Sequence, residues 1–219
     1  NFKWGSKTYL MGIVNVTPDS FSGDGITNVD EAVHQGILME KEGADILDVG
    51  GESTRPGGEP VSEEEEISRV LPVIEKLSKE VSIPISIDTY KAEVARLALL
   101  AGAKLINDVW GGRMEPEILQ VAAQANVPII LMHNRSSPKD AKQKEKLGGR
   151  YEGIEFANLI EDIKDELQEI VDTARAAGVR EENIVIDPGI GFGKTTEQNL
   201  EIVRRLSEFR SLGYPILVG

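Results

Sequence analysis

Residues 184–194, Ile-Val-Ile-Asp-Pro-Gly-Ile-Gly-Phe-Gly-Lys, decide the fold. Three β-branched residues in a row predict a short buried strand, and Asp187 ends that strand on a carboxylate. Three glycines at alternating positions then let the backbone approach whatever the carboxylate faces. Thr195 and Gln198 have the spacing of a capping box, so we expect a helix next. The stretch therefore predicts a unit made of a strand, a polar end, a loop and a helix.

The same glycine-rich loop has three other interpretations. Gly193-Lys194-Thr195 resembles the end of a phosphate-binding P-loop, but Pro188 stands where that motif needs a glycine. A dinucleotide fingerprint fails as well, because Lys194 occupies the position three after Gly191. A glycine-rich turn that binds nothing stays open.

Short apolar strands alternate with amphipathic helices along the whole chain. We expect strands at 9–14, 45–49, 84–87, 104–106, 128–132, 184–187 and 215–218, with helices at 28–42, 62–77, 91–101, 117–125, 160–177 and 195–209. This alternation is typical of parallel βαβ units. Its length and order favour an α/β fold of the (β/α)8 TIM-barrel type over a doubly wound sheet. We expect one domain over residues 1–219, with the last βα unit or units missing from this sequence.

Two helices carry more specific expectations. The acidic run at 63–66 is most simply a solvated first turn that the helix dipole favours. We expect the last helix to carry the apolar residues Leu200, Val203, Leu206 and Phe209.

Polar residues follow the predicted strands at the ends where barrel enzymes place their active sites. These residues are Asn15, Glu52, Asp88, Asn107, His133 and Asp187. Helix capping and turn formation explain one or two of them. Six at one edge favour a shared ligand site.

Asp88, Asn107 and Asp187 supply two carboxylates and one amide. This set suits the amino-pyrimidinone edge of a flat heterocycle, whose N–H groups need acceptors. Two ionised aspartates would also favour positive charge that grows on a bound ring. The alternative is structural pairing of these carboxylates with Lys91 or Lys194.

The composition limits the partners. With 24 Lys and Arg against 37 Asp and Glu, the net charge of −13 argues against nucleic acid and anionic membranes. The absence of cysteine excludes disulfides, thiolate metal sites and a cysteine nucleophile. The sequence has no apolar run long enough to cross a membrane and no signal-peptide pattern. We therefore expect a soluble cytoplasmic protein with small-molecule substrates.

Five motifs, in chain order, resemble those of the dihydropteroate synthase family. They are Asn-Val-Thr-Pro-Asp-Ser-Phe-Ser at 15–22, Gly-Glu-Ser-Thr-Arg-Pro-Gly at 51–57, Ile-Asp-Thr at 87–89, Ile-Asn-Asp at 106–108, and the Asp-Pro-Gly stretch at 187–194. The resemblance implies condensation of 6-hydroxymethyl-7,8-dihydropterin pyrophosphate with p-aminobenzoate to 7,8-dihydropteroate and pyrophosphate. It also implies a homodimeric transferase of folate biosynthesis that sulfonamides target.

The resemblance assigns roles to individual residues. It implies that the pterin contacts Asp88, Asn107, Val109, Met132, Asp187 and Gly191, and that p-aminobenzoate and the closing loops involve Phe21, Thr54, Arg55, Pro56 and Phe192. Asp88, Asp187 and Arg55 would be catalytic, and Asn15 would help to place Mg²⁺ on the pyrophosphate.

Two departures from the family pattern lead to further expectations. Trp110 stands where the family usually has a small residue, so it alters packing near the pterin or fills a gap below it. After Gly219 the family continues with a serine, a lysine, an arginine and a histidine near the site. We therefore expect residues beyond 219 in the natural protein and a barrel that these seven strands do not close. A corrinoid-dependent methyltransferase and a non-catalytic pterin-binding module are the alternative functions.

Overall fold

The computed structural model describes residues 2–16, 28–52, 61–136 and 155–219. Helices and strands alternate along the chain. The elements are β1 (Met11–Asn15), α1 (Asn28–Glu42), β2 (Ile46–Gly50), α2 (Glu63–Glu80), β3 (Ile85–Asp88), α3 (Ala92–Ala101), β4 (Leu105–Asp108), α4 (Glu117–Ala125), β5 (Ile129–Met132), α5 (Leu159–Ala176), β6 (Ile184–Asp187) and α6 (Thr196–Arg204). Short 3-10 helices cover Glu181–Asn183 and Leu206–Leu212.

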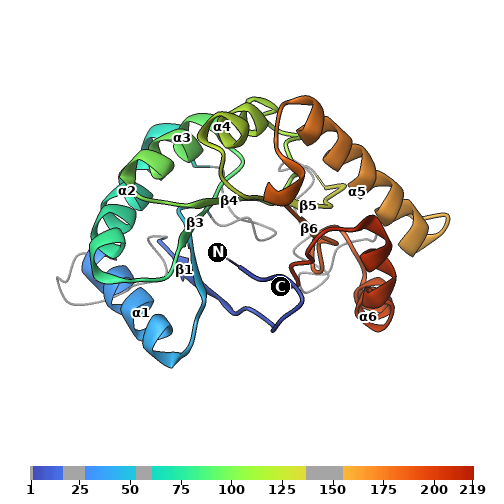
Figure 1. The fold of residues 1–219 in the computed structure, drawn as a ribbon, viewed down its shortest axis with the longest axis horizontal. Helices are drawn as coiled ribbons and strands as arrows, with labels where there is room; N and C mark the ends of the chain where they lie inside the picture. The colour runs from blue at the N-terminus through green and yellow to red at the C-terminus, as the bar shows by residue number, and fades with distance from the viewer. Residues whose placement is uncertain (1, 17–27, 53–60, 137–154) are drawn as a thin grey trace, which may run out of the picture.

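The six strands form one parallel sheet in the order β1-β2-β3-β4-β5-β6. Figure 1 shows the sheet curved like an open barrel, with the helices on its convex side and both chain ends on the concave side. Sequential parallel strands with a helix after each are the repeating unit of the TIM barrel, so the expected fold class is confirmed. Among the described helices, none combines the length and the apolar character that crossing a membrane requires.

The expected seventh strand, at 215–218, is reduced to a single β-bridge. Ile216 bridges Ile186 of β6 in parallel, and Leu217 donates its backbone N–H to the carbonyl of Ile186 at 2.8 Å. In the described residues no ladder joins this segment to β1, so the barrel is open, as expected from seven strands.

Two faces of each strand pack differently. Residues that face the helices form the main apolar core, which includes Leu47, Val49, Ile87, Ile106 and Ile186. The residues that alternate with them along the strands therefore line the concave face. Parallel strands buried on both faces lack the polar–apolar alternation of half-exposed strands, which explains their short apolar runs.

The last helix corrects one expectation. Instead of a helix to residue 209, α6 ends at Arg204 and a 3-10 helix follows from Leu206. Leu200 and Val203 are 51% and 53% exposed, whereas Ile202 and Phe209 are buried. Helical spacing does not extend across the break at Arg205, so residues on either side of it no longer share a face.

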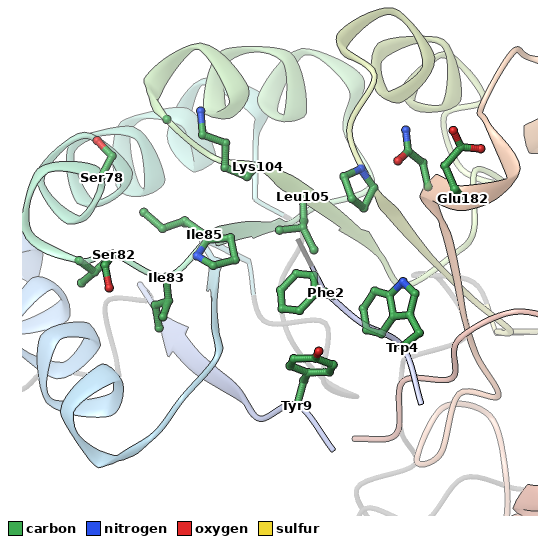
Figure 2. Close-up of a pocket in the computed structure, with 15 residues that line it drawn as sticks. Phe2, Trp4, Tyr9, Ser78, Ser82, Ile83, Ile85, Lys104, Leu105 and Glu182 are labelled. Carbon is green, nitrogen blue, oxygen red and sulfur yellow. The ribbon is translucent and has the colours of Figure 1, made fainter. Parts of the chain in front are cut away.

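The amino ends of the strands border a cavity of about 1050 Å³. Figure 2 shows Phe2, Trp4 and Tyr9 around it, together with Ile85 and Leu105 of β3 and β4. Phe2 stacks on Trp4 with ring centroids 5.1 Å apart and meets Tyr9 edge-on at 4.8 Å. The amino-terminal segment thus covers the end of the sheet opposite to the expected site.

Candidate active site

The three polar residues expected to bind a ring lie on the concave face at the carboxyl ends of the strands. Asp88 of β3 pairs in register with Asn107 of β4. Both alternate with Ile87 and Ile106, which belong to the helix-side core. Asp187 ends β6 in the same way after Ile186 and pairs in register with Met132. Residues far apart in the sequence therefore meet at one rim.

A fourth polar residue on this face, Asp48 of β2, was missed by the sequence analysis. Asn107 Nδ2 donates a hydrogen bond to Asp48 Oδ2 at 2.8 Å. The signal was a single acid inside the buried strand Ile-Leu-Asp-Val-Gly, where an unpaired carboxylate is costly. Asp48 therefore fixes the orientation of the Asn107 amide, with Nδ2 toward Asp48 and the amide oxygen away from it.

Asp88 carries an unused acceptor. Its buried Oδ1 has no hydrogen-bond partner among the described residues. Burial, and next the charge of Asp48, raise the pKa of Asp88 well above its ordinary value. A ligand N–H at this oxygen would satisfy it and favour its ionised form.

Asp187 is held by the loop that follows it. The backbone N–H of Gly189 donates to Asp187 Oδ1 at 2.7 Å. Burial raises the pKa of Asp187 to about 6, and this hydrogen bond opposes the rise. Gly191, expected beside the pterin, has a φ of 85° and open space where a Cβ would stand. The backbone can approach a ligand there.

An apolar cluster lies at the same end of the sheet. Val109, Trp110 and Met132 are buried together, and Tyr90 and Phe192 pack against them. The structure thus brings Val109 and Met132, expected at the pterin, beside Phe192, expected at p-aminobenzoate. A flat ring with a polar edge needs such apolar surroundings for its faces.

Trp110 is itself a buried member of this cluster. Its ring is 5% exposed, meets Tyr90 edge-on at 5.0 Å, and Nε1 donates to the carbonyl of Ser136 at 2.9 Å. Asp108, beside it, accepts from the backbone N–H groups of Trp110 and Gly112. Both residues therefore shape the turn after β4.

Two other polar strand ends have structural partners. Glu52 pairs with Lys91, which also pairs with Glu66 of α2. Glu66 is 1% exposed, so the expectation of a wholly solvated acidic run is wrong: the buried ammonium of Lys91 draws one glutamate inward. Lys91 therefore pairs with Glu52 and Glu66, and not with Asp88 as the alternative interpretation held.

The His133 ring is also engaged away from the concave face. Its ring contacts Glu166 of α5 and the ammonium of Lys194. Of the six polar residues expected at strand ends, Glu52 and His133 thus bind neighbouring side chains of the protein.

The remaining expected site residues fall into two groups. Asn15 ends β1, where its side chain is exposed at the open edge of the sheet. The other four, Phe21, Thr54, Arg55 and Pro56, lie outside the described residues.

A parallel barrel with carboxylates, an amide and an apolar cluster at its carboxyl rim belongs to the class of barrel enzymes that bind a flat polar ring. The family described as "Pterin binding enzyme" matches residues 11–219. The dihydropteroate synthase of Clostridium beijerinckii is 53% identical over 219 residues, which are 100% of this chain and 76% of that protein. The chain therefore belongs to the dihydropteroate synthase family and is a transferase.

Solved structures agree with this assignment. Dihydropteroate synthase from Clostridium difficile, determined in the presence of pteroic acid, has a TM-score of 0.88 and 46% identity, covering 99% of this chain and 77% of that chain. The enzyme from Xanthomonas albilineans, determined with 4-aminobenzoic acid, has a TM-score of 0.86 and 42% identity, with coverages of 96% and 72%. The expected family is therefore confirmed.

Proposed function

We propose that this protein joins 6-hydroxymethyl-7,8-dihydropterin pyrophosphate to p-aminobenzoate and releases pyrophosphate, as a step of folate biosynthesis. The observation that carries the proposal is the concave rim of Asp88, Asn107 and Asp187 beside the cluster of Val109 and Met132. Membership of the dihydropteroate synthase family supports the same reaction.

The rim residues would hold the pterin by its hydrogen-bonding edge. Asp88 Oδ1 needs a donor, and an unsatisfied buried acceptor costs about 1–3 kcal/mol. The amide oxygen of Asn107 points away from Asp48, because Nδ2 takes the Asp48 bond. Ring N–H and amino groups supply the donors that these oxygens lack, and Met132 and Val109 would cover the ring faces.

The chemistry needs charge stabilisation more than proton transfer. The bond from the pterin methylene carbon to the pyrophosphate oxygen breaks, and its electron pair leaves with pyrophosphate. The methylene carbon becomes cationic, the amine nitrogen lone pair forms the new C–N bond, and the nitrogen releases a proton to solvent. Ionised Asp88 and Asp187 would favour the cationic ring, and Phe192 would pack on the incoming aromatic amine.

Asn15 fits a limited role toward Mg²⁺. Magnesium takes oxygen ligands and is commonly held by one or two protein groups together with substrate phosphates. The described residues contain no group of three acidic or histidine side chains that could hold a metal, but the Asn15 amide stands exposed at the rim. When bound, the ion would offset the charge of the leaving pyrophosphate.

The Asn15 proposal has its own test. We expect Asn15→Ala to lower kcat about tenfold at limiting Mg²⁺, equal to about 1.4 kcal/mol, with partial recovery at saturating Mg²⁺. Asn183→Ala, at the amino end of β6, is the control. Equal loss at all Mg²⁺ concentrations would remove Asn15 from the metal site.

Several finer predictions belong to the same proposal. Phe21, Thr54, Arg55 and Pro56 would close over the substrates, with Arg55 near the anionic groups. Homodimer assembly, a cytoplasmic location and sulfonamide inhibition stay predictions that the resemblance implies.

The deciding experiment mixes the purified enzyme with the dihydropterin pyrophosphate, p-aminobenzoate and Mg²⁺ and follows pyrophosphate release. We expect release that depends on all three, with dihydropteroate formed in equal amount. Tight pterin binding without turnover would favour a non-catalytic pterin-binding module instead.

A further inference from the structure

Lys194, at the end of the loop after β6, is buried although it carries an ammonium group. It is 4% exposed. Nζ donates to the backbone carbonyls of Gly189 at 2.8 Å and Phe192 at 3.2 Å, and lies 3.4 Å from the carbonyl of His133. Nζ also lies 3.0 Å from His133 Nδ1. In the described residues no carboxylate forms a salt bridge with Lys194, so backbone and histidine acceptors hold the ammonium.

The direction of the His133 hydrogen bonds follows from Glu166. Hydrogen bonds from His133 and Arg135 lower the pKa of Glu166 to about 2, so the carboxylate is ionised and can only accept. His133 Nε2, 3.1 Å from Glu166 Oε2, must therefore carry the proton. Burial lowers the pKa of His133 to about 4, which keeps the ring neutral at pH 7. Nδ1 is then the acceptor for Lys194.

One residue, Gly189, connects Lys194 to the proposed ring ligand Asp187 through its two backbone polar groups. The carbonyl of Gly189 accepts from Lys194, and the N–H of Gly189 donates to Asp187 at 2.7 Å. Gly189 has a φ of 72°, and a Cβ there would stand 2.0 Å from the carbonyl oxygen of His133. Only glycine fits, but glycine alone does not fix a conformation.

The loop from Asp187 to Lys194 contains two more left-handed glycines, at 191 and 193. Such a segment has many accessible conformations unless something fastens it. Lys194 contacts this loop at two points. One is Gly189, which hydrogen-bonds the proposed pterin ligand Asp187, and the other is Phe192, the proposed p-aminobenzoate contact.

We propose that Lys194 is a positioning residue, whose buried ammonium fastens the β6 loop so that Asp187 and Phe192 are held at the pterin and p-aminobenzoate sites. Burial lowers the pKa of Lys194 to about 7, so below that pH its positive charge also favours the ionised form of Asp187. This inference rests on the proposed roles of Asp187 and Phe192. The other charged or titratable groups that face Lys194 are His133, Arg135 and Glu166.

The test compares Lys194→Met, which removes charge and donors, with Lys194→Gln, which keeps an N–H donor without charge. Lys79→Met, at an exposed position of α2, is the control with the same change in net charge. Binding of 6-hydroxymethyl-7,8-dihydropterin is measured between pH 5 and 8, because this alcohol has no phosphates that titrate. Steady-state kinetics with p-aminobenzoate and thermal unfolding complete the comparison.

We expect Lys194→Met to weaken pterin binding at pH 7 by at least tenfold and to raise the KM for p-aminobenzoate. In both Lys194 variants the pH midpoint of binding should move upward, and Lys194→Gln should recover part of the affinity. If Lys194→Met fails to fold, the pH midpoint of Lys194→Gln decides.

The outcomes separate this inference from the proposed function. A wild-type protein that neither binds the pterin nor releases pyrophosphate overturns the proposed function. An active wild type with Lys194 variants of unchanged affinity and pH midpoint overturns only the role of Lys194. A lower unfolding temperature with unchanged binding would also overturn it, because Lys194 would then be structural only.

Discussion

At the scale of single residues, burial at the rim disfavours the charged forms of two aspartates and one lysine. Burial raises the pKa of Asp187 to about 6 and raises the pKa of Asp88, and burial lowers the pKa of Lys194 to about 7. Perturbed groups that gather at one end of a barrel are typical of functional sites. The carboxylates become useful acceptors once a ligand donor compensates for their burial.

The raised pKa of Asp187 predicts how pterin affinity depends on pH. A raised pKa means that Asp187 is protonated below about pH 6, where it can no longer accept two donors. Affinity for 6-hydroxymethyl-7,8-dihydropterin should therefore fall as the pH drops below 6. Asp187→Asn should lose about 10–100-fold at pH 8, because a hydrogen bond to a charged group contributes about 1.5–3 kcal/mol.

Calorimetric titration from pH 5 to 8 checks this prediction. Glu64→Gln, an exposed acid-to-amide change on α2, should keep the wild-type profile. A profile in Asp187→Asn that matches the wild type would remove Asp187 from the ring site.

Functional residues could be predicted from the sequence where a polar side chain directly follows an apolar strand. Asp88, Asn107 and Asp187 were predicted from their positions after apolar strands, and the structure brings them to one rim. Asp48 escaped because it lies inside a strand, so only its hydrogen bond to Asn107 reveals its place. Partner choice is also invisible in the sequence: nothing local indicates that Lys91 pairs with Glu66.

At the scale of elements, local signals predicted helix starts better than helix packing. Thr195 and Gln198 form the expected capping box, with reciprocal bonds of 3.2 and 2.8 Å. A cap is made by residues three apart, so the sequence contains all of it. Beyond the end of α6 at Arg204, Phe209 is buried in the core, and helical spacing alone does not encode this change of packing.

The buried pairs of Lys91 join α2 to the end of β2 and predict a large stability effect. Lys91→Met would leave Glu52 and Glu66 buried without their cation. Loss of one partner from a buried pair typically costs about 3–5 kcal/mol. We expect a loss of this size in the free energy of unfolding at pH 7, measured by urea denaturation.

The loss should be smaller at pH 5, because burial already raises the pKa of Glu66 and removal of Lys91 raises it further. Protonation would then relieve the uncompensated charge. Lys76→Met, which breaks the exposed pair with Asp30, should cost at most about 1 kcal/mol. Adding Glu66→Gln to Lys91→Met should recover part of the loss. Equal effects of the two lysine changes would contradict the buried-network interpretation.

At the scale of the whole molecule, the two ends of the sheet have different compositions. The carboxyl ends present Asp88, Asn107 and Asp187, whereas the amino ends are covered by the aromatic rings of Phe2 and Trp4. Strand order and this polarity were predictable because parallel βαβ units place all carboxyl ends at one edge. The cover at the amino ends was not predicted, since aromatic residues near a chain end show no periodic pattern.

This separation predicts that stability and catalysis can be changed independently. Trp4→Ala removes the stack on Phe2 at 5.1 Å and the edge contact with Tyr9 at 5.5 Å. Because an aromatic pair contributes about 0.5–1.5 kcal/mol, we expect the free energy of unfolding to fall by about 1–2 kcal/mol. The kcat and both KM values should stay within about twofold of the wild type, because the rings lie at the opposite end of the sheet from the rim. Denaturant unfolding and pyrophosphate-release kinetics on the same preparations check both halves of the prediction. A changed KM for the dihydropterin substrate with unchanged stability would show that the amino-terminal segment acts on the site and does not merely cover the strands.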